Sequence, residues 1–361
     1  MDNLSLKKKI IFSLVTLLIF LILLELGIRA ILYLTPLGKK RLNLDPYEEP
    51  DPNFGWRLKA NYQNIRFSPD TKKEEILVVN SKGFRGKEFN KEKTAGVIRL
   101  ITMGDSVTFG IAPETCPYPA QLQELFNQKY PNKVEVINAG VEGYSSEYVL
   151  KRLKYDILQY KPDFITVYVG WNDLYAVNPL SPWNYKKLTG LAKFLNKFYF
   201  YKAFRRLIFL EIKPKVEQIF MNNSYNQKVE DVYLEFEPFI YKENLKKIIE
   251  VAKENEIKIA LINLASILSD KMKEEDIKKV HYPYFTSDIE KLKILQERYN
   301  KTIEELARKE NVPLIDLNRA INQIPDKGRL FFDTMHPYCE GNKVISQTIF
   351  DNLIEQKILN F

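Results

Sequence analysis

Histidine and cysteine are scarce in this sequence of 361 residues, which contains two of each: His281, His336, Cys116 and Cys339. A zinc site needs three or four histidine, cysteine or carboxylate ligands close together, and no other histidine or cysteine is spaced to join His281. The scarcity argues against a metal site, and we expect no cofactor. It also makes each histidine a residue of interest.

A nucleic-acid-binding motif is also missing, although the net charge is +8. The 54 lysine and arginine residues are spread along lysine-rich segments instead of forming one basic block. Such a distribution is typical of a solvated face, or of attraction to an anionic membrane or polymer. We expect no nucleic-acid partner, and the sequence leaves the oligomeric state open.

Near the N-terminus, charge is absent over fifteen residues, 10–24, which follow a basic tail of residues 1–9. Fifteen helical residues reach only about 22 Å, short of the roughly 30 Å hydrocarbon core of a bilayer. The apolar helix must therefore continue through Glu25 and Arg29, which are four residues apart and can form an ion pair. We predict one transmembrane anchor over residues 10–34, with the lipid bilayer as its partner.

The orientation of this anchor depends on its flanks. No small-x-small cleavage site follows the apolar run, which favours an uncleaved anchor over a removed signal peptide. Basic residues lie on both sides, at 7–9 and 39–41, so the positive-inside rule discriminates weakly. Because a short basic tail before a first apolar helix usually stays inside, we expect a single-pass membrane protein with an exoplasmic main domain.

The segment 104–110, Gly-Asp-Ser-Val-Thr-Phe-Gly, follows an apolar run over residues 97–103 that is typical of a buried parallel strand. Ser106 is therefore expected at the carboxyl end of a strand, where open α/β sheets bind their ligands. A hydroxyl in that position is a candidate nucleophile, although Gly-Asp-Ser also occurs in ordinary turns.

A possible partner for this hydroxyl stands near the other end of the chain, where Asp333 precedes His336 by three residues. A neutral imidazole can take the proton of a serine hydroxyl, and a carboxylate can hold the tautomer of the ring and stabilise the imidazolium. The alternative is that the two residues only shape a turn before a helix.

Two more predicted strands, 134–139 and 164–169, run into turns that contain Gly143 and Asn172. Acyl transfer needs hydrogen-bond donors aimed at the oxyanion, and a glycine N–H together with an asparagine side chain can supply them. Either turn alone is common, so the argument rests on the combination.

Taken together, these segments resemble the SGNH hydrolases, also called the GDSL family of esterases and lipases. The family's nucleophile, glycine, Gly-x-Asn-Asp and Asp-x-x-His blocks correspond to residues 104–110, 138–144, 170–173 and 333–336. One departure is Trp171, where the family often has a smaller residue, and it concerns the width of the acyl pocket.

The resemblance implies a role for each matching residue. Ser106 is the expected nucleophile, His336 the general base and Asp333 the residue that orients the base. The Ser106 N–H, the Gly143 N–H and the Asn172 side chain would form the oxyanion hole. Three further residues of the blocks are expected to contact substrate: Asp105, Tyr144 and Trp171.

The resemblance also implies the fold: a flavodoxin-like three-layer α/β/α domain with a five-stranded parallel sheet in the order 2-1-3-4-5. The remaining sequence agrees, because apolar strands alternate with helices. We predict further strands over 257–264 and 312–317, and helices over 241–254, 287–309 and 341–357. After the tail and the anchor, we assign a linker with a short β element to residues 35–94 and the hydrolase domain to residues 95–361.

Two segments have open roles. The linker contains Asn-Ser-Lys-Gly-Phe-Arg-Gly at 80–86, a passage that membrane-anchored bacterial relatives often share; it would pack on the domain or form a strap over the active-site edge. Residues 174–239 form an insert in the family pattern, with apolar and basic residues at helical spacing between 187 and 208. The insert could be a lid, an arm on the membrane surface or an additional packed helix.

The cysteines and the second histidine lie close in sequence to the expected site. Cys116 follows Ser106 by ten residues and Cys339 follows His336 by three, so a fold that joins serine and histidine brings both sulfurs into one neighbourhood. They form either a disulfide, which an exoplasmic location permits, or two free thiols. His281 is either a rim residue that contacts substrate or an ordinary loop histidine.

The resemblance implies a membrane-anchored serine esterase. By analogy with anchored relatives we expect O-acyl esters, in particular O-acetyl groups on cell-surface or exported polysaccharide. An O-acyltransferase would use the same residues, with a sugar hydroxyl in place of water. A lysophospholipid or other lipid ester and a non-catalytic surface scaffold are the further alternatives.

Overall fold

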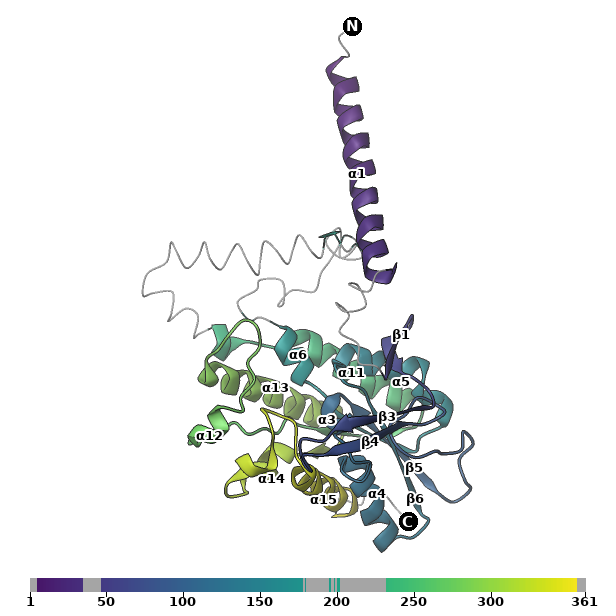
Figure 1. Ribbon diagram of the computed structural model, residues 1–361, viewed down its shortest axis with the longest axis vertical. Helices are drawn as coiled ribbons and strands as arrows, with labels where there is room; N and C mark the ends of the chain where they lie inside the picture. The colour runs from purple at the N-terminus through teal and green to yellow at the C-terminus, as the bar shows by residue number, and fades with distance from the viewer. Residues whose placement is uncertain are drawn as a thin grey trace. The chain divides into compact units, whose positions relative to one another are not determined.

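The computed structural model describes residues 5–34, 47–177, 179, 195, 198, 200–201 and 232–355 (Figure 1). The chain divides into two compact units, one of residues 1–46 and 181–228, the other of residues 47–180 and 229–361. Most of the expected helical insert at 174–239 lies outside the described residues.

The first unit contains the helix α1 (Leu6–Leu34). Its stretch of 24 residues from Lys7 to Ala30 contains an 18-residue window with a mean hydropathy of 2.7, and it is long and apolar enough to cross a membrane, as an anchor or as a signal sequence. The expected ion pair is present, because Arg29 Nε donates to Glu25 Oε1 over 2.8 Å. The other Glu25 oxygen accepts from the backbone N–H of Phe200, at 3.1 Å.

The second unit is built on a parallel sheet of five strands: β5 (Ile98–Gly104), β6 (Val134–Gly140), β7 (Phe164–Tyr168), β8 (Lys258–Ile262) and β9 (Leu314–Ile315). Their spatial order is β6-β5-β7-β8-β9, which is 2-1-3-4-5 in chain order. The predicted fold class is therefore confirmed.

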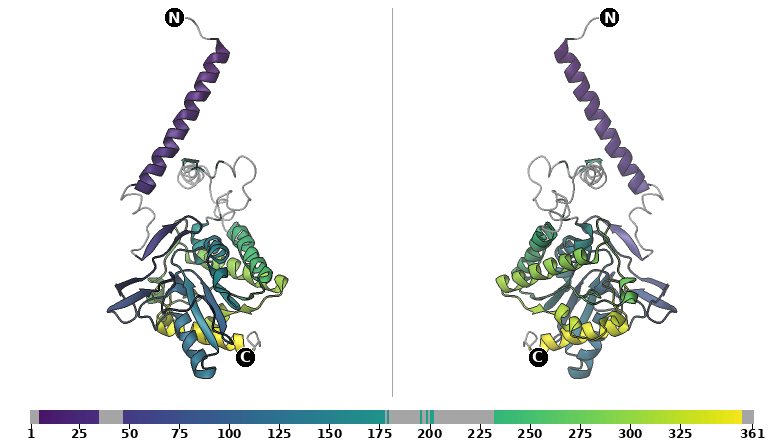
Figure 2. Two further views of the ribbon diagram at one scale, coloured as in Figure 1. Left: turned by 90° about the vertical axis from the view of Figure 1, so that its right-hand side faces the viewer. Right: turned by 90° about the vertical axis from the view of Figure 1, so that its left-hand side faces the viewer.

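Helices cover both faces of this sheet, as Figures 1 and 2 show. One face carries α4 (Tyr118–Lys129), α14 (Leu317–Asn322) and α15 (Cys339–Glu355), and the other carries α5 (Ser146–Tyr155), α11 (Phe239–Glu254) and α13 (Ile289–Glu310). The shorter helical elements are α3 (Ser106–Phe109), η1 (Ile157–Tyr160), α6 (Trp171–Ala176), α12 (Glu274–Ile277) and η3 (Lys327–Leu330).

The last strand is shorter than predicted. We expected a strand over 312–317, and β9 contains only Leu314 and Ile315. The cause is Asp316, whose carboxylate accepts from the backbone N–H of Arg319 and caps α14. The capping interaction ends the extended backbone two residues early.

Two hairpins precede the sheet: β1 (Glu48–Asp51) with β2 (Gly55–Leu58), and β3 (Tyr62–Phe67) with β4 (Glu74–Val79). They belong to the same compact unit as the sheet, and this unit starts at Tyr47, before the predicted start of the hydrolase domain at residue 95. Arg85 forms bridges with Val79 and with Asn138 of β6, so its backbone joins the second hairpin to the edge of the sheet.

Arg99 of β5 is a polar residue in the core, with 1% of its surface exposed. Its guanidinium donates to the carbonyls of Asn90, Lys91 and Tyr160, at 2.7–2.8 Å, and pairs with Glu135 at 2.7 Å. One side chain thus connects the loop before β5, through Asn90 and Lys91, to Tyr160 and to Glu135 of β6.

Replacing this side chain should destabilise the sheet unit. Arg99→Met removes the donors for three carbonyls and leaves Glu135 without its partner, so we expect a loss of roughly 3 kcal/mol or more in stability. Thermal unfolding of the full chain measures it, with Arg308→Met on an exposed position of α13 as the matched control. Equal melting temperatures for the two variants would contradict the assigned role.

Candidate active site

The carboxyl ends of three neighbouring strands form one edge of the sheet. In the parallel register, Gly104 of β5 is opposite Gly140 of β6 and Tyr168 of β7. The chain leaves these three residues in the turns that carry Ser106, Gly143 and Asn172. The register therefore delivers the expected nucleophile and both expected oxyanion donors to the same edge.

Ser106 is the first residue of the short helix α3. The preceding residue, Asp105, caps this helix because its Oδ1 accepts from the backbone N–H of Val107 at 3.0 Å. The turn needs close contact with the neighbouring strand: a Cβ on Gly140 would lie 2.2 Å from the nitrogen of Phe109. Position 140 therefore requires glycine, because any side chain would clash with the backbone of Phe109.

The hydroxyl of Ser106 forms a hydrogen bond with His336, with 2.7 Å between Oγ and Nε2. The other ring nitrogen, Nδ1, lies 2.7 Å from Oδ2 of Asp333. An ionised carboxylate only accepts, so the proton of a neutral ring is on Nδ1 and Nε2 is free to accept from the hydroxyl. The structure thus brings together the three residues that the sequence suggested, in the arrangement that nucleophilic catalysis requires.

Asp333 is held by its surroundings in the ionised form. Its Oδ1 accepts from the backbone N–H groups of Met335 and His336, at 3.0 and 2.8 Å. Burial raises the pKa of this carboxyl, but the hydrogen bonds and charge of His336, together with the N–H of Met335, outweigh burial and leave the pKa below its usual value. The ring of Phe332 stacks on the imidazole, with 5.6 Å between centroids.

The two expected oxyanion turns are tied to each other. Gly143 has a φ of +75°, a conformation that glycine adopts without strain. Asn172 Nδ2 donates to the carbonyl of Tyr144 over 3.0 Å. Asp173 accepts from both the N–H and the hydroxyl of Ser146, at 2.8 and 2.5 Å, and burial raises its pKa to about 6.

The three residues expected to contact substrate are buried instead, with exposed fractions of at most 2%: Asp105, Tyr144 and Trp171. Their side chains pack inside the turns that they belong to, and the Tyr144 hydroxyl donates to the carbonyl of Trp56 at 2.5 Å. In this structure the three side chains lie beneath the surface of the site, and their contact with substrate stays a prediction.

His281 lies at the rim beside the catalytic carboxylate. Its side chain is 70% exposed, and its Nδ1 is 3.9 Å from Oδ2 of Asp333. The backbone is fixed, because the N–H donates to Thr334 Oγ1 and the carbonyl accepts from Tyr175. The structure thus places the ring beside Asp333, and contact of His281 with substrate stays a prediction.

Sequence reasoning missed the residues that hold the glycine turn from outside, above all Trp56 and Arg66. Trp56 Nε1 donates to the Glu142 carbonyl, and Arg66 pairs with the Glu142 carboxylate. No motif marks them, since they lie far from the four blocks in sequence. Within the described ranges, no three histidine, cysteine or carboxylate side chains are grouped to hold a metal ion.

Cys116 and Cys339 form a disulfide across 223 residues of sequence, with their Cα atoms 4.9 Å apart. Gln121 strengthens the connection, because its Nε2 donates to the carbonyls of both cysteines, at 2.7 and 3.1 Å. The disulfide thus links the segment after Ser106 to the residues directly after His336. The alternative of two free thiols is wrong for this structure.

Comparison with known sequences identifies a family. The model of the GDSL-like lipase/acylhydrolase family matches residues 102–344 of this chain. "Thioesterase 1/protease 1/lysophospholipase L1" from Escherichia coli is 32% identical over 82 residues, which are 22% of this chain and 38% of that protein. The chain therefore spans well under half the length of this relative.

Solved structures are similar at low sequence identity. LAE5, an α/β hydrolase enzyme from the metagenome of Lake Arreo, Spain, is 15% identical with a TM-score of 0.44, covering 74% of this chain and 99% of that one. The acetyl xylan esterase AlAXEase is 19% identical with a TM-score of 0.44, covering 70% and 98%. The acetylxylan esterase Axe2 from Geobacillus stearothermophilus is 17% identical with a TM-score of 0.43, covering 71% and 94%.

Stability should depend on pH through Asp105. Burial raises the pKa of this carboxyl to about 7, so the folded protein holds a proton that the unfolded chain releases near pH 4. The stabilisation from this proton is then fully present below about pH 4, is lost progressively as the pH rises from about 4 to about 7, at up to about 1.4 kcal/mol per pH unit, and is gone above that.

Asp105→Asn removes this ionisation and keeps the cap, so its melting temperature relative to the wild type should increase from pH 5 to pH 8. The control is Asp270→Asn, an exposed carboxylate whose hydrogen bond and ion pair with Lys293 hold its pKa below the usual value. A constant difference between Asp105→Asn and the wild type over this range would refute the assignment.

Reduction of the disulfide should loosen the site. Cys116→Ser with Cys339→Ser frees a loop of 223 residues, for which we expect a loss of roughly 2–5 kcal/mol in stability. Dithiothreitol should lower the melting temperature of the wild type to that of the double variant, and it should leave the melting temperature of the double variant unchanged. A wild type that is insensitive to reductant would show that the bond contributes nothing.

Proposed function

Because the chain belongs to the GDSL-like lipase/acylhydrolase family, we propose that it is a membrane-anchored serine esterase that hydrolyses O-acyl esters. The observation that carries this proposal is the continuous hydrogen-bonded chain from Ser106 through His336 to Asp333, with 2.7 Å at each step. A hydroxyl, an imidazole and a carboxylate in this order form a general-base-activated nucleophile.

In the first half of the reaction, Ser106 Oγ attacks the ester carbonyl and its proton passes to His336 Nε2. Asp333 stabilises the imidazolium and does not take the proton. The tetrahedral intermediate collapses when His336 Nε2 returns the proton to the leaving alcohol, and the acyl group stays on Ser106. Water then attacks the acyl enzyme with His336 as base, which releases the acid and restores the hydroxyl.

The oxyanion is stabilised by the backbone N–H groups of Ser106 and Gly143 and by the side chain of Asn172. A carboxamide has two N–H donors. Since Asn172 uses one for the Tyr144 carbonyl, the other remains for the oxyanion. Preorganised donors of this kind stabilise the transition state without reorganisation during the reaction.

As substrate we propose O-acetyl groups on a cell-surface or exported polysaccharide. The choice rests on analogy with membrane-anchored relatives. One observation is consistent with it: the apolar helix at residues 7–30, which would hold the enzyme at a membrane. An O-acyltransferase differs only in the acceptor, a sugar hydroxyl in place of water.

We place the catalytic unit on the exoplasmic side. The short basic tail before α1 favours this orientation, and the disulfide between Cys116 and Cys339 needs an oxidising compartment. We keep the assignment of residues 1–9 as tail and 10–34 as anchor, and start the catalytic unit at residue 47.

A lipid ester is the second candidate, and one observation favours it: the Escherichia coli relative is named as a thioesterase and lysophospholipase. A membrane-held enzyme would meet such substrates in the bilayer surface. The two candidates differ in the acyl chain, so activity against esters of increasing chain length separates them.

The full chain in detergent should hydrolyse p-nitrophenyl acetate and release acetate from an acetylated oligosaccharide. Ser106→Ala should lower kcat by several orders of magnitude on both substrates, whereas Ser81→Ala, at an exposed turn, should not change it. Asn172→Ala should lower kcat about a hundred- to thousandfold, with Asn255→Ala at the opposite edge of the sheet as its control.

Three outcomes would decide against the proposal or narrow it. A wild type with the activity of Ser106→Ala would exclude a serine esterase. Acetate release only in the presence of an added sugar acceptor would identify a transferase. Hydrolysis of a lysophospholipid in preference to the acetylated oligosaccharide would select the lipid ester.

A further inference from the structure

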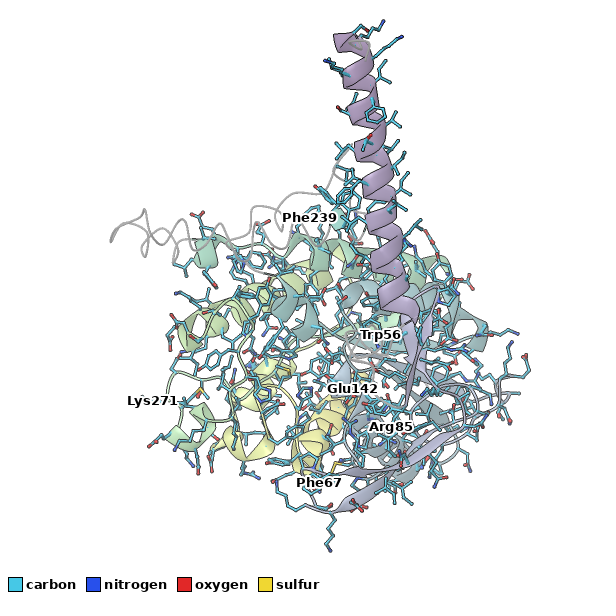
Figure 3. The ribbon with its side chains drawn as sticks, turned by 45° about the horizontal axis from the view of Figure 1, so that its top comes forward. Trp56, Phe67, Arg85, Glu142, Phe239 and Lys271 are labelled. Atoms are coloured by element: carbon cyan, nitrogen blue, oxygen red, sulfur yellow. A yellow bond between two sulfur atoms is a disulfide. The ribbon has the colours of Figure 1, made fainter. Side chains whose placement is uncertain are left out.

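Trp56, on the first hairpin, lies against the turn that supplies an oxyanion donor. Its indole Nε1 donates to the carbonyl of Glu142 over 3.1 Å. Figure 3 labels Trp56 and Glu142, which come from β2 and from the turn after β6. The two residues are 86 positions apart in sequence, so the contact is made only by the fold.

The same residue also holds the other side of Gly143. The hydroxyl of Tyr144 donates to the backbone carbonyl of Trp56 over 2.5 Å, and the two rings lie edge to face with 5.3 Å between centroids. Between these anchors, a Cβ on Gly143 would be 3.2 Å from the indole ring. Trp56 is therefore hydrogen-bonded to both neighbours of Gly143, and its ring occupies the space that a side chain at this position would need.

The hydrogen bond to Glu142 has a consequence for the donor itself. The carbonyl of Glu142 and the N–H of Gly143 belong to one planar trans peptide group, in which the two bonds point in opposite directions. Fixing the carbonyl on the indole side fixes the N–H on the opposite side. The indole thus sets the direction of the Gly143 donor without touching the substrate.

The second hairpin supports the same turn through charge. Arg66 of β3 pairs with the carboxylate of Glu142 at 3.3 Å and donates to the Tyr47 hydroxyl at 2.9 Å. On the other side, the Tyr144 carbonyl accepts from Asn172, the side-chain donor of the oxyanion hole. Both halves of the oxyanion hole are thereby connected to residues 47–66.

We propose that Trp56 is a positioning residue for the oxyanion hole and that the side chains of Trp56 and Arg66 tie the hairpin segment 47–67 to the active site. This segment lies before the stretch that matches the family, residues 102–344. The inference rests on the proposed function for its catalytic readout. It assigns to Trp56, a residue between the apolar helix and the sheet in sequence, the task of holding the Gly143 peptide group in its productive orientation.

The test compares two neighbouring substitutions in the full chain. Trp56→Phe keeps an aromatic ring and removes the N–H donor, whereas Arg57→Ala changes an exposed side chain on the same strand. We expect Trp56→Phe to lower kcat for p-nitrophenyl acetate about ten- to hundredfold with KM within twofold, because the lost orientation matters only when the oxyanion forms. Arg57→Ala should keep the wild-type kcat.

A boronic acid, which forms a tetrahedral adduct with the serine, supplies the second readout. Its inhibition constant should rise for Trp56→Phe by the same factor as kcat falls, while the two variants have equal melting temperatures. Unchanged kcat and inhibition in Trp56→Phe would overturn the inference, as would an equal loss in Arg57→Ala. If the wild type hydrolyses no ester, the proposed function fails separately.

Hydrogen exchange of the backbone tests the positioning without any activity. Amides of residues 141–145 should exchange faster in Trp56→Phe than in the wild type, and at the wild-type rate in Arg57→Ala. Equal exchange in all three proteins would show that the indole does not hold the turn. Faster exchange throughout the sheet unit would indicate general destabilisation and would equally reject a positioning role.

Discussion

The parallel register at Gly104 is the constraint on which the site depends. Because β5 is the central member of three adjacent strands, its last residue is level with Gly140 and Tyr168, and all three chains turn away at the same edge. Because neighbouring strands are about 5 Å apart, the turns that follow them, which carry the nucleophile and the oxyanion donors, lie close to one another. A slip of one residue in either pairing would move a donor to the wrong face.

The general base reaches this edge from the far end of the chain, 230 residues after the nucleophile. A short hydrogen bond cannot by itself restrain so distant a segment, since closing a long loop costs conformational entropy. The structure supplies covalent and local restraints nearby. The disulfide from Cys116 to Cys339 joins the two segments, and Asp333 holds both the ring and the backbone of His336. The imidazole is therefore positioned by the fold before any substrate binds.

The two hairpins before the sheet belong to the compact unit that contains the active site. By composition they look like a linker, with many turn-forming residues, yet they pack on the sheet unit and hold the turn that contains Gly143. The proposed anchor ends at residue 34, and the first hairpin starts at residue 48. The hairpins thus belong to the catalytic unit that we propose, although they precede the part of the chain that matches the family.

Strand periodicity and block spacing are local properties, and they were enough to predict the fold class and to single out Ser106, Asp333 and His336 as candidates, while the order of the strands came from family resemblance. The early end of β9 and the burial of Trp171 were decided by tertiary structure, since a capping carboxylate and a packed interior depend on partners distant in sequence. The same holds for Trp56: a lone tryptophan in a polar segment gives no local signal, and its role exists only where the hairpin meets the turn at Gly143. Contacts that join distant segments are specified by the whole chain, which is why they could not be predicted from spacing.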